Sequence, residues 1–282
     1  MPSCKEMGVL FISKQAKRTK DAETQSNYLG LYRRADVLSR DSMMIYKYMP
    51  CDDERLNALK INQLWMSPPQ RFNDPFDCDH LIGTDMSHDE RLRVIAEVGS
   101  CNTDKLSARP DITKIIIQKD GADYFKKKLL QIGICCFSSG WNSVAMWSHY
   151  ADSHRGICLG YDARDLIGKT GYSFAPVEYQ VDPPQIHISD VAFDFETAIH
   201  RYIFKKKTEW EREKEWRLVR LLGGKGLVES PMSLHSVIIG INTSLEDEKS
   251  IQAILSDSDV SFFKLEQEAG TFDLQKSAFE GT

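Results

Sequence analysis

Glu213-Lys-Glu-Trp-Arg-Leu-Val-Arg220 is the stretch of sequence that decides the fold. Its charged residues recur at every second position, so that Glu213, Glu215 and Arg217 share one face. Because successive side chains of a strand point to opposite faces of a sheet, this alternation predicts a β-strand. The strand would present two carboxylates and a guanidinium side by side.

Strands and helices alternate irregularly along the rest of the chain. Short apolar and aromatic runs predict further strands over residues 43–49, 63–67, 132–138, 155–161, 176–179, 237–240, 260–265 and 271–274. Amphipathic spacing predicts helices over 54–62, 87–130 with a break near Gly121, 146–150, 190–207 and 244–255. Expected N-caps are Asp52 or Asp53, Asn142 or Ser143, and Ser244. This order lacks the regular β-α-β-α rhythm of a doubly wound sheet and predicts an α+β fold, with a mixed sheet flanked by helices.

Composition bounds the class of protein. The chain has 282 residues, of which 41% are hydrophobic and 27% charged, as in ordinary globular proteins. The first forty residues carry eight Lys and Arg against four Asp and Glu, and few apolar residues. We therefore expect a partly disordered N-terminal extension over residues 1–40. A single α+β domain would follow over 41–282, with a helical insertion at about 87–130.

Charge and cysteine content bear on the partners and the compartment of the protein, and local basic patches could still bind nucleic acid or an anionic membrane. The formal net charge of −5 gives the whole molecule no attraction for nucleic acid or anionic membranes. No run approaches the ~20 apolar residues of a membrane span, and no signal-peptide pattern is present. The seven cysteines include no C-x-x-C pair. These features predict a cytoplasmic protein with reduced thiols, no membrane partner and no structural zinc.

The first candidate site is the pair Glu213-x-Glu215. Two carboxylates this close raise the proton affinity of one of them. Such a pair can hold a ribose hydroxyl, a metal ion or a proton for acid–base chemistry. The alternative is an exposed strand face with cross-strand salt bridges.

The second candidate site is Met146-Trp-Ser-His-Tyr-Ala-Asp-Ser-His-Arg-Gly156. Its candidate binding residues are Trp147, His149, Tyr150, His154 and Arg155. Aromatic planes beside a guanidinium suit a nucleotide or another anion. In the alternative interpretation, Trp147 and Tyr150 are core residues and Arg155 pairs with an acid.

The third candidate site is the turn sequence Asn73-Asp-Pro-Phe-Asp77. Hard oxygen and nitrogen ligands from Asp74, Asp77, His149 and Glu215 could together hold a divalent metal. No Walker, H-E-x-x-H or G-x-S-x-G sequence is present, which disfavours the common nucleotide-hydrolase, protease and esterase classes.

Seven motifs resemble a bacterial family known as domain of unknown function 2971. They are Ile45–Tyr48, Leu64–Ser67, Phe72–Asp77, Cys136–Ser138, Met146–Gly160, Val177–Tyr179 and Trp210–Arg217. Their order and spacing agree with that family over about residues 43–275. The resemblance implies no settled activity.

A more distant similarity is to the ADP-ribosyltransferase superfamily, whose members clamp NAD in a split β-sheet. This resemblance rests on an early strand with Tyr46, Lys47 and Tyr48 and a late strand with Glu-x-Glu. It implies that the early strand lies beside the nicotinamide half of NAD. It also implies that Glu215 is the catalytic glutamate and Glu213 its substrate-orienting companion. The remaining residues expected to bind NAD are Ser67, Asn73, Asp74, Phe76, Trp147, His149, Tyr150, His154 and Arg155.

The function that the resemblance implies is an NAD-dependent ADP-ribosyltransferase-like enzyme. NAD would be consumed as a substrate, and the acceptor would be a protein or nucleic acid, as in a bacterial toxin or a phage-defence effector. One alternative is a metal-dependent nuclease or phosphoesterase. The other is a non-catalytic nucleotide-binding module with a platform of Trp147, Tyr150 and Arg155.

Overall fold

A computed structural model of the chain describes residues 43–78, 81–83, 85–98, 106, 108, 110–221 and 225–279. All of these residues belong to one compact unit, Ser42–Thr282. The N-terminal extension expected over residues 1–40 lies outside the described residues.

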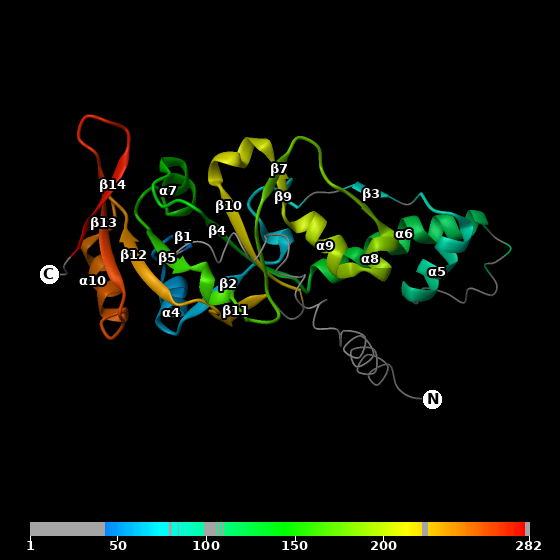
Figure 1. The fold of residues 1–282 in the computed structure, drawn as a ribbon, viewed down its shortest axis with the longest axis horizontal. Helices are drawn as coiled ribbons and strands as arrows, with labels where there is room; N and C mark the ends of the chain where they lie inside the picture. The colour runs from blue at the N-terminus through cyan, green and yellow to red at the C-terminus, as the bar shows by residue number, and fades with distance from the viewer. Residues whose placement is uncertain are drawn as a thin grey trace. The chain divides into compact units, whose positions relative to one another are not determined.

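An eight-stranded sheet forms the centre of this unit, in the order β14-β13-β12-β5-β1-β4-β10-β6 (Figure 1). Its strands are β1 (Met44–Met49), β4 (Gly133–Ser138), β5 (Ile157–Asp162), β6 (Ser173–Pro176), β10 (Glu215–Arg220), β12 (Leu234–Ile239), β13 (Ser261–Gln267) and β14 (Leu274–Ala278). The β12–β13 pair is parallel, and the other pairs are antiparallel. The predicted α+β class with a mixed sheet and flanking helices is therefore confirmed.

Smaller elements surround this sheet. Three two-stranded ladders join β2 (Gln63–Met66) to β11 (Gly226–Glu229), β3 (Leu81–Gly83) to β8 (Gln185–His187), and β7 (Glu178–Gln180) to β9 (Lys205–Lys207). The α-helices are α4 (Asp53–Lys60), α5 (His88–Val98), α6 (Pro110–Leu129), α7 (Val144–Tyr150), α8 (Ile188–Phe193), α9 (Phe195–Ile203) and α10 (Leu245–Ile254). Short 3-10 helices are η1 (Pro69–Arg71), η3 (Ala163–Leu166) and η4 (Thr208–Glu213). Within the described part of the chain, no helix combines the length and apolar character needed to cross a bilayer.

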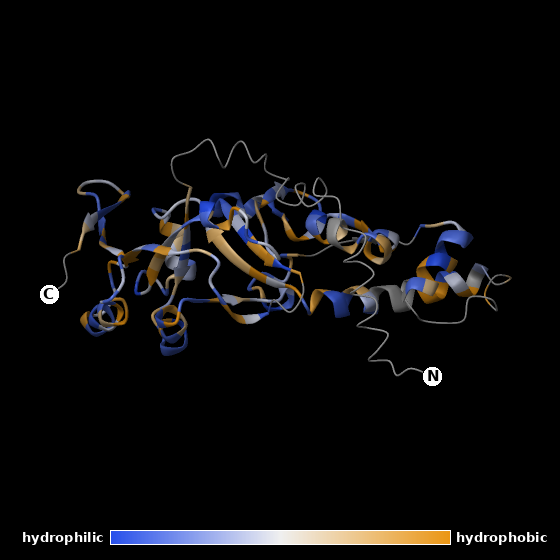
Figure 2. Ribbon diagram, turned by 60° about the horizontal axis from the view of Figure 1, so that its bottom comes forward, coloured by the Kyte–Doolittle hydropathy of each residue, from blue (hydrophilic) through white to orange (hydrophobic). Residues whose placement is uncertain are grey.

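The two faces of the sheet bury different cores. Ile157 and Leu159 of β5 face a core that includes α4 and α10. Cys158 faces the opposite side, in a core with Trp147 of α7. A third core packs β4 and β10 against the helices α5, α6, α8 and α9. In Figure 2 most strands of the sheet have hydrophobic colours, and the helices carry both colours. Burial of these apolar faces is the main force that holds the sheet to its helices.

The sheet is nearly divided between β1 and β4. Six residue pairs join β1 to β5, and six join β4 to β10. Between β1 and β4 there is a single pair, Tyr46 with Ser138. Beyond that pair the ammonium of Lys47 donates to the carbonyl of Cys136 at 3.3 Å, so a side chain bridges the two strands. The backbone pairing of β1 with β4 thus ends here, and a side chain provides a hydrogen bond to the carbonyl that the neighbouring strand no longer pairs.

Predicted N-cap residues cap three helices, α4, α7 and α10. Asp52, Ser143 and Ser244 accept hydrogen bonds from the backbone N–H groups of the helices that follow them. These three predictions are confirmed. The physical reason is that an oxygen two or three residues before a free N–H satisfies an otherwise unpaired donor.

Three predictions of local structure are wrong. The strand predicted from Glu213 begins at Glu215, because Glu213 ends a 3-10 helix and Lys214 adopts a left-handed conformation with φ of +47°. The helix predicted over 190–207 ends at Ile203, and Lys205–Lys207 forms strand β9. Helix α6 continues through Gly121 without the expected break. In the first two cases tertiary pairing overrides the local pattern.

Gly156 provides a test of the packing between β5 and its neighbours. A Cβ atom at this position would lie 2.2 Å from the carbonyl oxygen of Met49. We expect Gly156→Ala to lower the free energy of unfolding by about 1–3 kcal/mol, because the backbone must shift. At Gly140 the nearest atom would be 3.5 Å away, so Gly140→Ala is the matched control. Equal urea midpoints for the two variants would contradict this packing.

Candidate functional site

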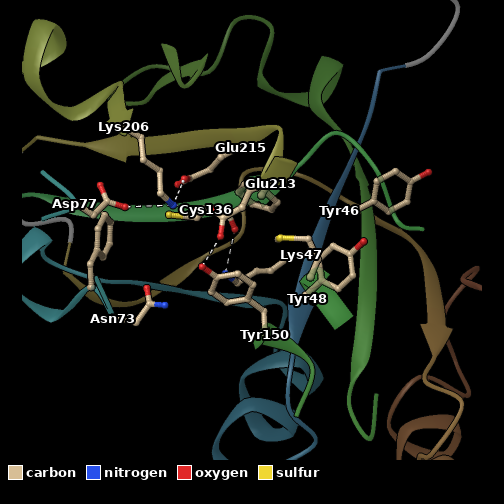
Figure 3. Close-up of a pocket in the computed structure, with 13 residues that line it drawn as sticks. Tyr46, Lys47, Tyr48, Asn73, Asp77, Cys136, Tyr150, Lys206, Glu213 and Glu215 are labelled. Atoms are coloured by element: carbon tan, nitrogen blue, oxygen red, sulfur yellow. Dashed lines mark hydrogen bonds and ion pairs between the residues drawn. The ribbon is translucent and has the colours of Figure 1, made fainter. Parts of the chain in front are cut away.

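A pocket lies where β1 and β4 separate (Figure 3). Its cavity volume is about 110 Å³. It is lined by Tyr46, Lys47, Tyr48, Phe72, Asn73, Asp77, Cys136, Phe137, Met146, Tyr150, Lys206, Glu213 and Glu215. The three distant segments that the sequence singles out, around positions 47, 75 and 214, therefore meet at one hollow together with the end of α7.

A buried cluster of charges forms one wall of this pocket. The ammonium of Lys206 lies 2.5 Å from Glu213 Oε2, 2.9 Å from Glu215 Oε2 and 3.4 Å from Asp77 Oδ2. None of these four side chains is more than 10% exposed. Figure 3 shows Lys206 between Asp77 and Glu215, and Glu213 beside Tyr150. The ammonium thus donates hydrogen bonds to Glu213 and Glu215 and forms a longer ion pair with Asp77.

Arg217 is the second cation of the cluster and is fully buried. Its Nε donates to Glu215 Oε1 at 2.7 Å, and its Nη2 donates to both oxygens of Asp77 at 2.8 Å. Its Nη1 donates to the carbonyl of Ile203 at 2.6 Å. The guanidinium therefore joins strand β10 to the loop at Asp77 and to the end of α9, with the fork geometry that suits carboxylates.

Glu213 reaches the pocket from a fixed backbone. Its carbonyl accepts a hydrogen bond from Ser138 Oγ at 2.7 Å, and the left-handed Lys214 turns the chain into β10. Its Oε1 accepts a hydrogen bond from the Tyr150 hydroxyl at 2.7 Å. The side chains of Glu213 and Glu215 therefore do not lie on one strand face, although both line the pocket.

The charges around Glu215 determine its protonation state. Burial alone would raise the pKa of Glu215, but Arg217 and Lys206 outweigh this effect and lower the pKa to about 2. Burial likewise opposes the charged form of Lys206, yet Glu215, Asp77 and Glu213 together raise its pKa. The sequence predicts a raised proton affinity for one of the two adjacent carboxylates, and Glu215 is not that carboxylate. Two cations at hydrogen-bond distance decide its charge.

Burial also acts on the neutral side chains of the site. It is the main cause of the raised pKa of Tyr150, and the adjacent Glu213 adds to it. It raises the pKa of Tyr179, whose hydroxyl accepts from the backbone N–H of Glu215, to about 12. The Cys136 thiol has a raised pKa because it is buried beside Glu215. These groups stay neutral near pH 7 and serve as hydrogen-bonding partners, not as nucleophiles.

The loop over residues 73–77 is attached to the charge cluster at two points. Asp74 accepts a hydrogen bond from Trp210 Nε1 at 2.7 Å, and Arg217 holds Asp77. Asp74 also accepts from the backbone N–H of Phe76 at 2.9 Å, which shapes the turn. Two motifs separated by more than 130 positions therefore form one wall, and the attachment places Asn73 at the pocket.

Half of the residues predicted to form the site line the pocket. These are Glu213, Glu215, Tyr46, Lys47, Tyr48, Asn73 and Tyr150. The others, Ser67, Asp74, Phe76, Trp147, His149, His154 and Arg155, are not among its lining residues. Of these, Asp74 supports the wall from behind through Trp210.

The second candidate site is largely structural. Trp147 is 0% exposed and packs edge-on against Tyr48, so it offers no ring face to a ligand. His154 stacks on Trp147, and Arg155 forms an exposed pair with Asp152. A ligand platform of Trp147, Tyr150 and Arg155 is therefore wrong. The helix leads into the pocket through Tyr150 alone among these three.

The other misplaced residues belong to the sheet or the surface. Ser67 pairs with Ile134 in an isolated bridge and accepts from Trp65 Nε1. Phe76 is 71% exposed, and His149 lies on the exposed side of α7. Position in a motif did not reveal which way each side chain points, because that depends on elements far along the chain.

The proposed metal ligands do not converge. Asp77 and Glu215 are held by Arg217 and Lys206, and His149 is exposed. Within the described ranges, no group of three or more His, Cys, Asp or Glu side chains is arranged to hold a metal ion. A divalent ion at this wall would have to displace two buried cations.

Sequence reasoning missed Lys206 and Tyr179. The sequence predicts a helix over 190–207, whose last turn would contain Lys205-Lys-Lys207 and place all three lysines near the helix dipole and solvent. As a strand, this run points its middle side chain inward, while Lys205 and Lys207 pair with the exposed Glu178 and Glu209. The sequence does contain one indication of an inward-facing lysine, because three lysines directly precede an acid-rich segment.

Comparison with known proteins supports the first of the two resemblances. Residues 146–218 match the model of the family described as Protein of unknown function (DUF2971). The matched segment runs from α7 to β10 and includes Tyr150, Lys206, Glu213, Glu215 and Arg217. No curated protein and no solved structure matches the chain significantly.

Removal of Arg217 tests the structural role of the cluster. We expect Arg217→Met to lower the free energy of unfolding by about 3–5 kcal/mol, because Asp77 and Glu215 lose their main partner while buried. Arg155→Met is the matched control, and loss of its exposed pair should leave the free energy of unfolding nearly unchanged. Chemical denaturation measures both values. Similar losses in the two variants would show that the buried network is not the main support.

The stability of the fold should depend on Glu215 in acid. Its pKa falls from an ordinary 4.5 to about 2 in the folded protein, so the charged form is favoured by folding. This contribution is complete above pH 4.5 and is lost as the pH falls towards 2. It amounts to roughly 3 kcal/mol, at about 1.4 kcal/mol per pH unit between the two values. Thermal unfolding of the wild type and Glu215→Gln between pH 6 and 2 should show a weaker pH dependence in the variant. An identical slope would contradict the assignment.

Proposed function

We propose that the pocket binds NAD and that the protein is an ADP-ribosyltransferase-like enzyme. The observation that carries the proposal is the near-division of the sheet between β1 and β4. Two carboxylates stand on one side of this opening, and the Tyr46–Tyr48 segment stands on the other. This is the arrangement that the superfamily resemblance implies for a sheet that clamps NAD.

The aromatic walls of the cavity suit one ring of NAD, although the cavity is small for it. Its volume of about 110 Å³ is somewhat below that of an engineered cavity of ~150 Å³ that accepts benzene. Aromatic side chains of Phe72, Tyr48 and Phe137 line it. Nicotinamide is larger than benzene, so its ring would enter this space only after the side chains that line it move apart, and the adenosine half would lie outside it. Full engagement of NAD would therefore require the ligand to extend along the opening between the strands.

The chemistry requires a carboxylate beside the ribose. When the N-glycosidic bond breaks, its electron pair leaves with the nicotinamide nitrogen, and positive charge develops on the ribose. A fixed carboxylate in a water-poor pocket stabilises that charge without reorganising. The acceptor nucleophile then forms a bond to the ribose carbon and loses its proton. The pocket supplies the carboxylates, and an acceptor outside the cavity supplies the nucleophile.

The biological part of the proposal rests on the resemblance alone. It comprises a protein or nucleic-acid acceptor and a role as a toxin or phage-defence effector, whereas the proposed cytoplasmic location rests on the composition of the chain. The geometry of the pocket bears on the reaction with NAD and not on the acceptor.

Glu213→Gln tests the proposed reaction. We expect NAD to raise the melting temperature of the wild type and the protein to release nicotinamide from NAD. The variant should release nicotinamide at least about 100-fold more slowly, because it loses a preorganised charge. Glu178→Gln, at an exposed position on β7, is the control and should retain activity.

Other outcomes separate the alternatives. A melting-temperature rise with NAD but no release of nicotinamide would identify a nucleotide-binding module. Phosphodiester cleavage that needs Mg²⁺ or Mn²⁺ and stops with a chelator would identify a metal-dependent hydrolase. Wild-type release rates in Glu213→Gln would remove this carboxylate from the mechanism.

A further inference from the structure

Lys206 occupies an unusual position among the charged side chains of the site. Its neighbours in sequence, Lys205 and Lys207, form pairs with Glu178 and Glu209, which are 67% and 70% exposed. Lys206 alone of the three points inward, where its side chain is 5% exposed. Its ammonium also lies 5.2 Å from the ring centre of Trp210, which covers it. Strand β9 therefore delivers one lysine to the cluster and two to the surface.

The two glutamates use their oxygens differently. Both oxygens of Glu215 contact cations, Oε1 with Arg217 and Oε2 with Lys206 and Arg217. Glu213 gives only Oε2 to a cation, Lys206, and its Oε1 accepts from the neutral Tyr150 hydroxyl. A ligand hydroxyl can replace a phenolic hydroxyl without stripping a buried carboxylate of its counter-ion. Glu213 is therefore the carboxylate whose Oε1 can exchange the Tyr150 hydroxyl for a ligand hydroxyl at low cost.

We propose that Lys206 is a positioning residue, anchored by Asp77 and Glu215, that holds Glu213 with one oxygen directed at the ligand. The inference rests on the proposed function, because the ligand hydroxyl is that of the NAD ribose. It reverses the roles implied by the superfamily resemblance. Glu213 faces the ligand, and Glu215 belongs to the support.

The reason for a lysine here is geometric. Three carboxylates surround one ammonium, whose rotating donors make hydrogen bonds to Glu213 and Glu215 while Asp77 forms an ion pair at 3.4 Å. Arg217 fixes Asp77 and Glu215 from the other side, so two of the three acids are immobile. The third, Glu213, is then placed by its bond of 2.5 Å to Lys206. A shift of one carboxylate by about 1 Å can cost on the order of 100-fold in rate, so this placement matters for chemistry.

Three variants on one strand test the inference. Lys206→Met removes the ammonium and keeps the stem, Lys206→Arg keeps a cation, and Lys205→Met is the matched surface control. We expect Lys206→Met to lower kcat for nicotinamide release by about 100-fold with a much smaller change in KM for NAD. Lys206→Arg should recover part of that loss, and Lys205→Met should match the wild type. Wild-type kcat in a folded Lys206→Met protein would overturn the proposal.

A double variant covers the case in which Lys206→Met does not fold. Lys206→Met with Glu215→Gln removes one charge of each sign and keeps Arg217 paired to Asp77. The proposal expects this protein to fold and to remain slow, because Glu213 has lost its support. Recovery of wild-type turnover would overturn it.

A readout that does not use NAD separates this inference from the proposed function. Coupling of an amine to carboxylates with a carbodiimide, followed by mass spectrometry, reports how firmly Glu213 is held. Labelling of Glu213 should increase in Lys206→Met and not in Lys205→Met. If the wild type neither binds nor cleaves NAD, the proposed function fails, and unchanged labelling would separately overturn the positioning role.

Discussion

The guanidinium of Arg217 is the interaction on which the rest of the site depends. It is completely buried on a central strand and contacts Asp77, Glu215 and the end of α9 at once. Removal of these charges from water is costly, and only the close bidentate geometry compensates for it. Because Asp77 ends the loop over 73–77, this one contact also fixes a wall of the pocket. A single side chain therefore fixes strand β10, the loop over 73–77 and the end of α9 relative to one another.

The position of the cluster follows from the sheet. Strand β4 pairs with β1 only through Ser138 and Tyr46, so the two halves of the sheet separate between these strands. Side chains fill the opening, with Lys47 bridging to Cys136 and Tyr48 donating to the carbonyl of Gly140 at 2.8 Å. A continuous ladder would leave no hollow at this point. The interruption of backbone pairing and the presence of charged side chains are thus two aspects of the same site.

Sequence reasoning recovered what depends on short-range patterns. Short apolar and aromatic runs identified most central strands, and side-chain oxygens before amphipathic runs identified the caps Asp52, Ser143 and Ser244. It failed where the environment of a side chain is supplied from far away. Trp147 looked like a binding residue because of its neighbours in sequence, yet it is core. The local sequence places Lys206 at the end of a helix. Its inward orientation depends on partners that include Asp77, more than 120 positions earlier, and no local pattern reveals them. Local patterns show which side chains share a face of a strand or helix. They do not show which of these faces pack together, and that packing defines the site.

The cluster is also an argument about function. Replacement of a buried ion network by apolar side chains of similar volume is often neutral or stabilising, so stability alone does not explain its presence. Here the carboxylates of Asp77, Glu213 and Glu215 line a cavity of about 110 Å³ together with Lys206, and Arg217 holds two of these carboxylates in place. Buried charges that line a hollow are typical of sites where charge develops during a reaction. Lys206 and Arg217 keep Glu215 charged, and this permanent charge in turn keeps the ammonium in place beside Glu213. Under the proposed function, this fixed negative charge facing an aromatic pocket is what the departure of a neutral ring from a ribose requires.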